Sequence, residues 1–181
     1  NWQQHISKIA EAISEADNHQ HIIASHQLGG NVFFHKEDPV INQFAIQTDK
    51  DQVGTTDDLH RWFLKAGDNS EGKYSLVMSE DWVHGNRSVP NGDRKEIRQR
   101  NWAAAMAGCY SMVLGMDIAN TPVSWLKDCR TLQTFFESTT FNQMSPGDRL
   151  AHGETEYVMA NPGYDYILYS THARDGLGVI N

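Results

Sequence analysis

The apolar residues follow two patterns that alternate along most of the chain. Apolar side chains spaced three or four positions apart are typical of amphipathic helices, and continuous apolar runs are typical of buried strands. The helical pattern predicts helices at residues 2–16, 56–66, 93–107 and 125–136. The continuous runs predict strands at residues 21–26, 43–47, 74–78 and 110–116. Helices that alternate with fully apolar strands indicate a parallel sheet covered by helices, which is an α/β fold.

The pattern changes after residue 146. Residues 156–160 and 164–169 alternate in character on either side of a turn, which predicts a β-hairpin. We therefore expect an α/β domain over residues 1–146 and the start of an all-β domain over residues 147–181.

Composition and charge narrow the class of protein. Hydrophobic residues make up 39% of the sequence, enough to form a core. The formal net charge of -8 argues against a nucleic-acid or membrane-surface binder, because such proteins need basic patches. The sequence holds no apolar run of about 18 residues, the length that spans a bilayer. Cys109 and Cys129 match no metal or redox spacing, and buried thiols are favoured over a disulfide.

Polar residues close each of the predicted strands. In parallel α/β folds, ligands meet the residues at the carboxyl ends of the strands. The residues at these ends are His26, Gln27, Gln47, Asp49, Glu80, Asp81, Trp82 and Asp117. A purely structural strand needs no polar ending, so this coincidence predicts a binding or catalytic site.

Glu80 is the strongest catalytic candidate. It follows the apolar run 74–78 and precedes Asp81 and Trp82. A carboxylate in such a place can act as nucleophile or general acid, and a neighbouring aromatic ring can stack on a sugar. The alternative is a structural role for Glu80, in a helix cap or a loop salt bridge. Asp117 also has two interpretations: it binds sugar hydroxyls, or it caps a loop.

The histidines and tyrosines allow other kinds of site. His26, His84 and Asp117 would form a metal site if they converged, although their spacing matches no compact metal motif. His60 falls in a predicted helix and is expected at the surface. The tyrosines of the hairpin would form a carbohydrate-binding face, but alternation in a half-buried sheet explains them better. They are Tyr157, Tyr164, Tyr166 and Tyr169.

Three segments resemble the apiosidase-like glycoside hydrolases, a family of bacterial barrel proteins. They are residues 74–85, the helical segment 98–108 and the strand that ends at Asp117. In that family a small β-sandwich, sometimes described as collagen-binding, follows a (β/α)8 TIM barrel. The resemblance implies that residues 1–146 form the C-terminal half of the barrel and that residues 147–181 begin the sandwich.

The resemblance also implies a role for Glu80. Barrel glycosidases of this kind carry the acid/base Glu after the fourth strand and the nucleophilic Glu after the seventh. If the strand at 110–116 is the eighth, Glu80 follows the seventh and takes the nucleophile position. The acid/base Glu then lies upstream of Asn1, since Glu37 and Glu71 fall in loops. The helical pattern already present at the first residues leads us to expect a fragment of a longer protein.

We therefore expect a bacterial glycoside hydrolase that acts on a polysaccharide or oligosaccharide by a retaining mechanism, without a cofactor. Such a mechanism needs two carboxyl groups about 5–5.5 Å apart, so the fragment alone is expected to be inactive. Its expected partners are the carbohydrate and the N-terminal half of its own barrel. A secreted or periplasmic location is expected, with any signal peptide upstream. The residues expected to bind substrate beside Glu80 are His26, Gln27, Gln47, Asp81, Trp82 and Asp117.

Two alternatives stay open. One is a barrel that binds carbohydrate or protein without catalysis. The other is a metal-dependent barrel hydrolase.

Overall fold

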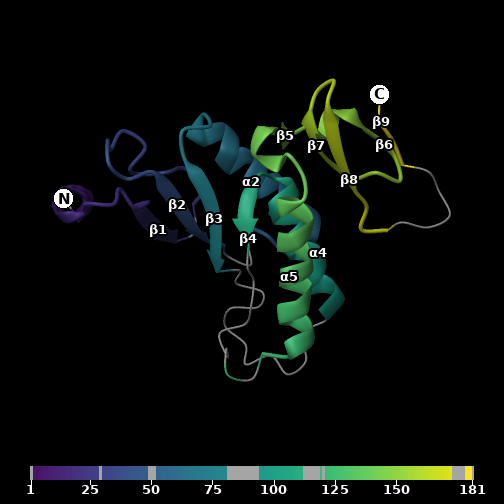
Figure 1. Ribbon diagram of the computed structural model, residues 1–181, viewed down its shortest axis with the longest axis horizontal. Coiled ribbons are helices and arrows are strands. Elements are labelled where there is room, and N and C mark those ends of the chain that lie inside the picture. The colour runs from purple at the N-terminus through teal and green to yellow at the C-terminus, as the bar shows by residue number, and fades with distance from the viewer. Residues whose placement is uncertain are drawn as a thin grey trace.

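The chain is a mixed α/β protein built on a four-stranded parallel sheet. The computed structural model describes residues 2–28, 30–48, 52–80, 94–111, 119, 121–172 and 178–180. The strands follow one another in sequence order as β1 (Ala24–Leu28), β2 (Gln43–Gln47), β3 (Ser75–Glu80) and β4 (Cys109–Ser111). Every neighbouring pair is parallel, as the alternation of helices and strands predicted. Figure 1 shows this sheet between the N-terminal helix and the C-terminal strands.

Four helices of the described chain fall where the apolar spacing predicted them. They are α1 (Trp2–Ala16), α2 (Thr56–Ser70), α4 (Arg94–Met106) and α5 (Val123–Glu137). The predicted strand at 21–26 was placed a few residues too early. Its first residues form no ladder: the paired segment begins at Ala24, and Ile22 is exposed. The predicted strand at 110–116 is confirmed through Ser111, and its remainder lies outside the described residues.

The start of α2 is set by a capping box. Thr55 Oγ1 accepts a hydrogen bond from the Asp58 backbone nitrogen at 3.1 Å, and Asp58 Oδ2 accepts one from the Thr55 nitrogen at 3.1 Å. These two bonds satisfy backbone donors that the first helical turn leaves unpaired.

Replacing Thr55 by Ala is expected to lower the free energy of unfolding by about 1 kcal/mol, because the Asp58 amide then loses its acceptor. Urea unfolding followed by circular dichroism measures the change. Thr56→Ala, one residue into the same helix, is the matched control and is expected to stay within about 0.5 kcal/mol of the parent. Equal losses in the two variants would contradict the capping role.

Helices α2 and α4 cover one face of the parallel sheet and form the main core. The strands contribute buried side chains at alternate positions, and small and aromatic residues of the helices pack against them. The residues at the centre of this layer are Phe44, Ile46, Leu76, Met78, Leu59, Phe63, Ala66, Ala104 and Ala107. The small residues of α4 allow it to lie close to the sheet, as the run of alanines in the sequence indicated.

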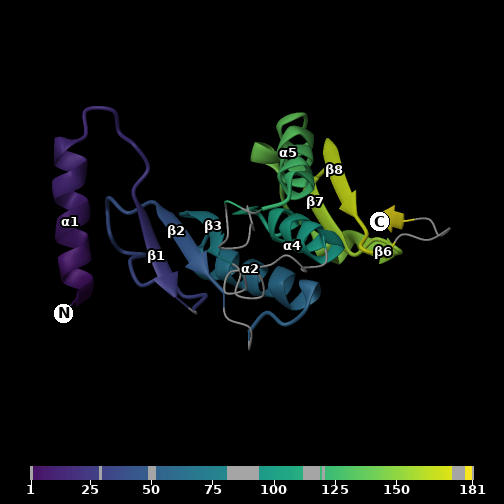
Figure 2. The ribbon, with the colours of Figure 1, turned by 90° about the horizontal axis from the view of Figure 1, so that it is seen from below.

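The other face of the sheet is not covered by these helices. The alternate positions that point away from α2 and α4 are exposed or half-buried, and they include His26 and Ala45. On this face Leu28 is 71% exposed and Tyr110 is 60% exposed. Helix α1 lies beyond the β1 edge, at the far end of the molecule from the C-terminal strands (Figure 2). Its residues Ile9 and Ile13 are also exposed.

Antiparallel strands follow the α/β layer. Strands β5 (Ser145–Pro146), β7 (Tyr157–Asn161) and β8 (Asp165–Tyr169) form one sheet, and β6 (Ala151–Gly153) pairs with β9 (Gly178–Ile180). Two short 3-10 helices, η2 (Phe141–Gln143) and η3 (Asp148–Leu150), flank β5. The predicted hairpin is confirmed, with its turn at Gly163 in the left-handed region at a φ of 86°. The antiparallel sheet includes Ser145 and Pro146, because β5 pairs with β7.

A second apolar cluster joins this antiparallel sheet to α4 and α5. Met106 of α4, Phe136 of α5 and Met159 of β7 are buried together. Helix α4 therefore lies between the parallel sheet and the C-terminal strands, with one side in each cluster. His60 of α2 was expected at the surface, and this expectation was wrong: its side chain is 2% exposed.

Glu156, just before β7, anchors the chain that follows β8. Its Oε2 accepts hydrogen bonds from the Thr171 backbone nitrogen at 2.7 Å and from the Thr171 hydroxyl, and its Oε1 lies 2.7 Å from His172 Nδ1. Burial alone would raise the pKa of the Glu156 carboxyl, but the hydrogen bonds from Thr171 and His172 outweigh it and hold this pKa below its usual value.

Because the folded pKa of Glu156 is lowered, its contribution to stability is present above the unfolded pKa and is lost as the pH falls through the folded value. Glu156→Gln is expected to cost about 1 kcal/mol at pH 7, reduced from the usual worth of charged hydrogen bonds by partial exposure. The gap between variant and parent is expected to shrink on acidification below the ordinary Glu pKa of 4.5. Urea unfolding between pH 3 and pH 7 measures it, with the exposed Glu154→Gln as control; a gap that stays constant over that range contradicts the assignment.

Candidate active site at the carboxyl ends of the parallel strands

Glu80 closes β3, as predicted, and a β-bulge decides which way it faces. Ile46 of β2 is aligned with Met78, but the next residue, Gln47, is aligned with Glu80, so Ser79 is an extra residue in β3. Without the bulge, Glu80 would follow Leu76 and Met78 onto the helix-covered face. The inserted residue moves it by one position, and its side chain joins that of Gln47 on the uncovered face.

Three hydrogen bonds fix the bulge. Ser79 Oγ donates to the carbonyl oxygen of Ile46 at 3.0 Å. The carbonyl oxygen of Glu80 accepts from the backbone nitrogen of Thr48 at 3.0 Å and from Thr48 Oγ1 at 3.4 Å. Thr48 is buried, so water does not compete for the hydrogen bonds that it donates to the end of β3. The Glu80 carboxylate is thus carried on a well-supported backbone while its side chain stays half-buried.

His26 and Gln47 lie on the same uncovered face as Glu80. The register aligns Leu28 of β1 with Gln47 of β2, and Gln47 with Glu80 of β3. His26 is exposed and lies two residues before Leu28 on β1. The structure therefore brings three of the predicted site residues to one face of the sheet. Gln47 and Glu80 lie at its carboxyl end, whereas His26 is in the middle of β1, aligned with Ala45, and not at the strand end where it was expected.

Gln27 lies on the opposite face and has a structural partner. Its Nε2 donates to the carbonyl oxygen of Val32 at 2.7 Å, and its Oε1 accepts from the Phe34 nitrogen at 3.2 Å. The side chain is buried, and both of its polar atoms hold the loop after β1. This arrangement does not favour the predicted contact of Gln27 with substrate.

Several predicted site residues lie outside the described part of the chain. They are Asp49, Asp81, Trp82, His84 and Asp117. Among the described residues that end β1, β2 and β3, Glu80 is the only carboxylate. In the same described ranges, no group of three His, Cys, Asp or Glu side chains is arranged to hold a metal ion. Both cysteines are free thiols, and burial raises the pKa of Cys109 far above its usual value.

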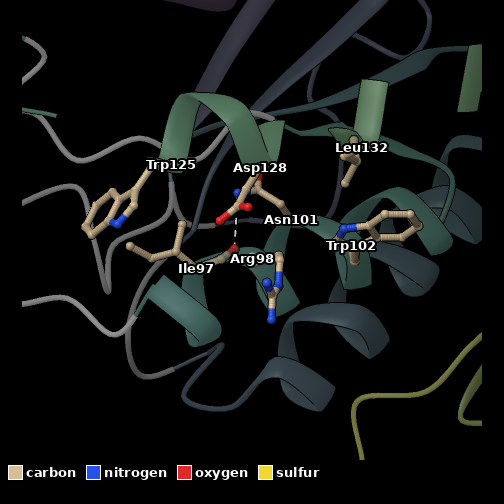
Figure 3. A pocket seen from close by; sticks show the side chains of 7 residues that line it. All are labelled: Ile97, Arg98, Asn101, Trp102, Trp125, Asp128 and Leu132. Carbon is tan, nitrogen blue, oxygen red and sulfur yellow. Dashed lines mark hydrogen bonds between the residues drawn. The ribbon is translucent and has the colours of Figure 1, made fainter. Parts of the chain in front are cut away.

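Two hollows occur away from this edge. Figure 3 shows the first, between α4 and α5, with Trp125 on one side of Asn101 and with Trp102 and Leu132 on the other. The Asn101 amide donates to the Ile97 carbonyl oxygen at 3.1 Å. Its volume of about 10 Å³ has room for about one water molecule, so it is a packing defect and not a substrate site.

Asp128, which lines this first hollow, forms an ion pair with Arg94. Arg94 Nε and Nη2 donate to the two carboxylate oxygens of Asp128 at 2.7 and 2.8 Å. The hydrogen bonds from Arg94 hold the pKa of Asp128 below its usual value despite partial burial. The ion pair of Asp128 with Arg94 therefore joins α4 to α5, and the lowered pKa makes Asp128 a poor candidate for a general acid.

The second hollow has a volume of about 460 Å³ and lies between the end of α2, the start of β3 and β5. Tyr74, Leu76 and Pro146 form its apolar lining. It opens at the amino ends of the parallel strands, away from Glu80. Substrate sites of parallel α/β enzymes lie at the carboxyl ends, so the edge that carries Glu80 is the better candidate site.

Two features of the structure, one in the site and one outside it, could not be predicted from the sequence. The bulge depends on pairing between β2 and β3, which leaves no local mark in the sequence. The buried pair of His60 with Asp148 joins residues far apart in the sequence, so no motif reveals it.

No membrane-crossing helix is found: among the described helices, none combines the length and the apolar character that a span requires. Comparison with models of protein families, with curated proteins and with solved structures finds no match for this chain.

Proposed function

We propose that this chain supplies the last four strands of a (β/α)8-barrel glycoside hydrolase and that Glu80 is the nucleophile. The observation that carries the proposal is the bulge at Ser79. It aligns Glu80 with Gln47 at the carboxyl end of the parallel sheet, which supports a side chain on the face that the helices leave uncovered. In a barrel this face is the interior, and its carboxyl-end rim holds the catalytic residues.

The two faces of the sheet support the barrel. One face is packed against α2 and α4, while residues such as Leu28 and Tyr110 on the other remain exposed. Among the described strands, β1 and β4 each have one unpaired edge. Parallel sheets are normally covered on both faces, and closing the sheet into a barrel covers the interior face and removes both edges. The exposed Ile9 and Ile13 of α1, beyond the β1 edge, are also suited to contact further barrel elements.

The chemistry follows from the position of Glu80. In a retaining mechanism its carboxylate attacks the anomeric carbon, and the leaving oxygen takes a proton from a second carboxyl group. The two carboxyl groups lie about 5–5.5 Å apart. Water then hydrolyses the glycosyl ester with the second group acting as base. Gln47 and His26, on the same face, are placed to donate hydrogen bonds to sugar hydroxyls. The rest of the barrel would supply the acid/base carboxylate, and Asp81, Trp82 and Asp117 stay predicted contacts of the sugar.

The proposal extends to the C-terminal strands and to location. The sheet of β5, β7 and β8 and the pair of β6 with β9 would begin the β-sandwich that follows the barrel. A polysaccharide-degrading enzyme meets its polymer outside the cell, so we place the protein in the secreted or periplasmic class.

Covalent trapping tests the nucleophile directly. A panel of 2-deoxy-2-fluoro glycosyl fluorides is incubated with the complete protein that contains this chain. The protein is then digested, and the masses of the protein and its peptides are measured by mass spectrometry. The fluorine at C2 slows both steps, whereas the fluoride at the anomeric carbon is a good leaving group. The glycosyl ester therefore accumulates. We expect one sugar per protein, attached to the peptide that contains Glu80.

Glu37→Gln is the matched control, because Glu37 is a well-exposed loop carboxylate whose charge is removed in the same way. The Glu37→Gln variant is expected to be labelled like the parent, and Glu80→Gln is expected to take no label. A label on another carboxylate would refute the role of Glu80. A protein that binds the parent sugars but forms no adduct and hydrolyses no aryl glycoside would favour a carbohydrate-binding barrel without catalysis.

A further inference from the structure

The structure separates the four tyrosines of the hairpin into two pairs. Tyr157 and Tyr169 pack in the cluster formed with α4 and α5, and their rings are stacked at a centroid separation of 6.0 Å. Tyr169 is stacked in turn on Trp102 of α4 at 5.3 Å. Tyr164 and Tyr166 are instead 82% and 37% exposed. Packing in a half-buried sheet therefore explains the first pair but does not account for the exposure of the second.

The exposed pair lies at the tip of the hairpin. The last residues paired between β7 and β8 are Asn161 and Asp165, so Tyr164 belongs to the turn and Tyr166 is the second residue of β8. The turn stands at the top of Figure 1, at the end of the two strands. A Cβ atom added at Gly163 would meet no atom within 4 Å beyond its chain neighbours. The space over the turn is therefore open to a ligand.

Two hydrogen bonds within the tip order its backbone and one of its rings. The Gly163 nitrogen donates to the hydroxyl oxygen of Tyr166 at 2.9 Å, which ties this ring back to the turn. The Tyr164 nitrogen donates to the carbonyl oxygen of Asn161 at 2.9 Å and closes the turn itself. A ring that is already ordered loses little conformational freedom when a ligand binds to it.

Two further hydrogen bonds brace the base of the tip from behind. Thr140 Oγ1 donates to Asp165 Oδ2 at 2.5 Å, and Asn161 Nδ2 donates to Gln143 Oε1 at 3.4 Å. Thr140 and Gln143 belong to the segment around η2 that follows α5, so the hairpin is attached to the helical layer next to its turn. The two exposed tyrosines are thus presented on a supported tip.

We propose that Tyr164 and Tyr166 form a second sugar-binding site, separate from the site at Glu80, that holds a neutral polysaccharide chain. One face of a sugar ring carries C–H groups and is apolar, and a tyrosine ring offers a matching apolar face beside a polar hydroxyl. The choice of a glycan as ligand rests on the proposed function. An enzyme that holds its polymer at a second point raises the effective concentration of the chain at its catalytic site.

The area of the tip favours a sugar over a protein partner. Burying a whole aromatic side chain removes roughly 150–250 Å² from water, and Tyr166 is already partly covered. The two rings therefore offer much less than the ~800 Å² that each partner buries in a stable protein interface. Such an area suits one or two sugar rings.

The charge favours a neutral sugar over an acidic one. The sequence has a formal net charge of -8, and the Asp165 carboxylate stands between the two tyrosines in the sequence. A polymer of uronic acids would be repelled by this charge, whereas a neutral polymer would not.

Affinity gel electrophoresis tests the site without turnover. The complete protein that contains this chain is run through gels with arabinoxylan, galactomannan or β-glucan as neutral polymers, and with polygalacturonate as the acidic one. We expect the parent to be retarded by at least one neutral polymer and not by polygalacturonate. Tyr164→Ala and Tyr166→Ala are each expected to weaken this binding at least about fivefold, the usual cost of truncating an aromatic anchor.

Phe34→Ala is the matched control, because it removes an aromatic ring that is 53% exposed on a distant loop. It is expected to bind like the parent. Tyr166→Phe keeps the ring but loses the oxygen that accepts from Gly163, so its binding is expected to fall between the parent and Tyr166→Ala. Tyr164 is largely exposed, so Tyr164→Ala tests the site without disturbing the packing of the sheet.

Three results would overturn the proposal: a parent that no neutral polymer retards, tyrosine variants that bind like the parent, or an equal loss in Phe34→Ala. Self-association of the parent that the tyrosine variants lose would assign the tip to a protein contact and would overturn it as well. Covalent trapping at Glu80 is measured on the same variants and is expected to be unchanged. Tyrosine-dependent binding without an adduct at Glu80 would refute the nucleophile and leave the second site standing, and the reverse pattern would refute the second site alone.

Discussion

With Glu80 as the proposed nucleophile, Glu80→Gln is expected to lower kcat/KM for aryl glycosides by at least about 10⁴-fold in the complete protein that contains this chain. Loss of a nucleophile costs hydrolases of other classes about this much or more, because the covalent step has no replacement. Glutamine keeps the size and the hydrogen-bonding shape of the side chain, so the backbone contacts of Thr48 and Ser79 at the bulge are expected to survive. Steady-state kinetics with a panel of aryl glycosides measures the loss.

Added azide separates a lost nucleophile from a damaged fold. In Glu80→Ala, azide can occupy the vacated space and attack the anomeric carbon from the same side as the missing carboxylate. Partial recovery of aryl release, with a glycosyl azide of inverted configuration as product, is the expected result. Glu37→Gln is expected to keep the parent rate. Full activity in Glu80→Gln would sink the proposed role of this residue.

Phe44→Ala is expected to destabilise the chain by about 3–5 kcal/mol, the largest stability effect that we predict. Phe44 is fully buried in the centre of β2, and its ring stacks on that of Phe33 at a centroid separation of 4.6 Å. The sheet lies on one side and α2 and α4 on the other, so little can move to fill the cavity. Since domains are stable by about 5–15 kcal/mol in total, such a loss is a large share of the free energy of unfolding.

Phe34→Ala is the matched control for Phe44→Ala, because it removes the same side chain from a loop where it is 53% exposed. A loss of about 1 kcal/mol or less is expected, from the edge contact with Trp2 alone. Urea unfolding at 25 °C compares the two. Similar losses in both variants would mean that the helix-covered face of the sheet is not the main core of the chain.

Much of the fold was written in local patterns of the sequence. The spacing of apolar residues placed α1, α2, α4 and α5, and the apolar runs placed β2 and β3 to within two residues. These predictions succeed because burying an apolar face requires a fixed period, 3.6 residues in a helix and 2 in a strand. The hairpin of β7 and β8 was equally local, since its turn and its flanking strands lie within one short segment.

The site was predictable only in part. That Glu80 ends a parallel strand follows from the apolar run before it and from the order of elements. Its neighbours on the sheet do not follow, because Gln27 and His26 are adjacent in sequence and yet point to opposite faces. Sequence position alone assigned both to the site, whereas the two-residue period of the strand sends only His26 to the face of Gln47 and Glu80.

By itself, then, the sequence determined the four helices, the parallel character of the first sheet, the hairpin and the presence of a carboxylate at the end of β3. Tertiary structure decided which face that carboxylate occupies, through the one-residue bulge between β2 and β3. It also decided that His60 is buried against Asp148, 88 positions away, instead of lying on the surface. Both outcomes depend on pairing between segments that are distant along the chain, and the energy of such pairing is not recorded in any local pattern.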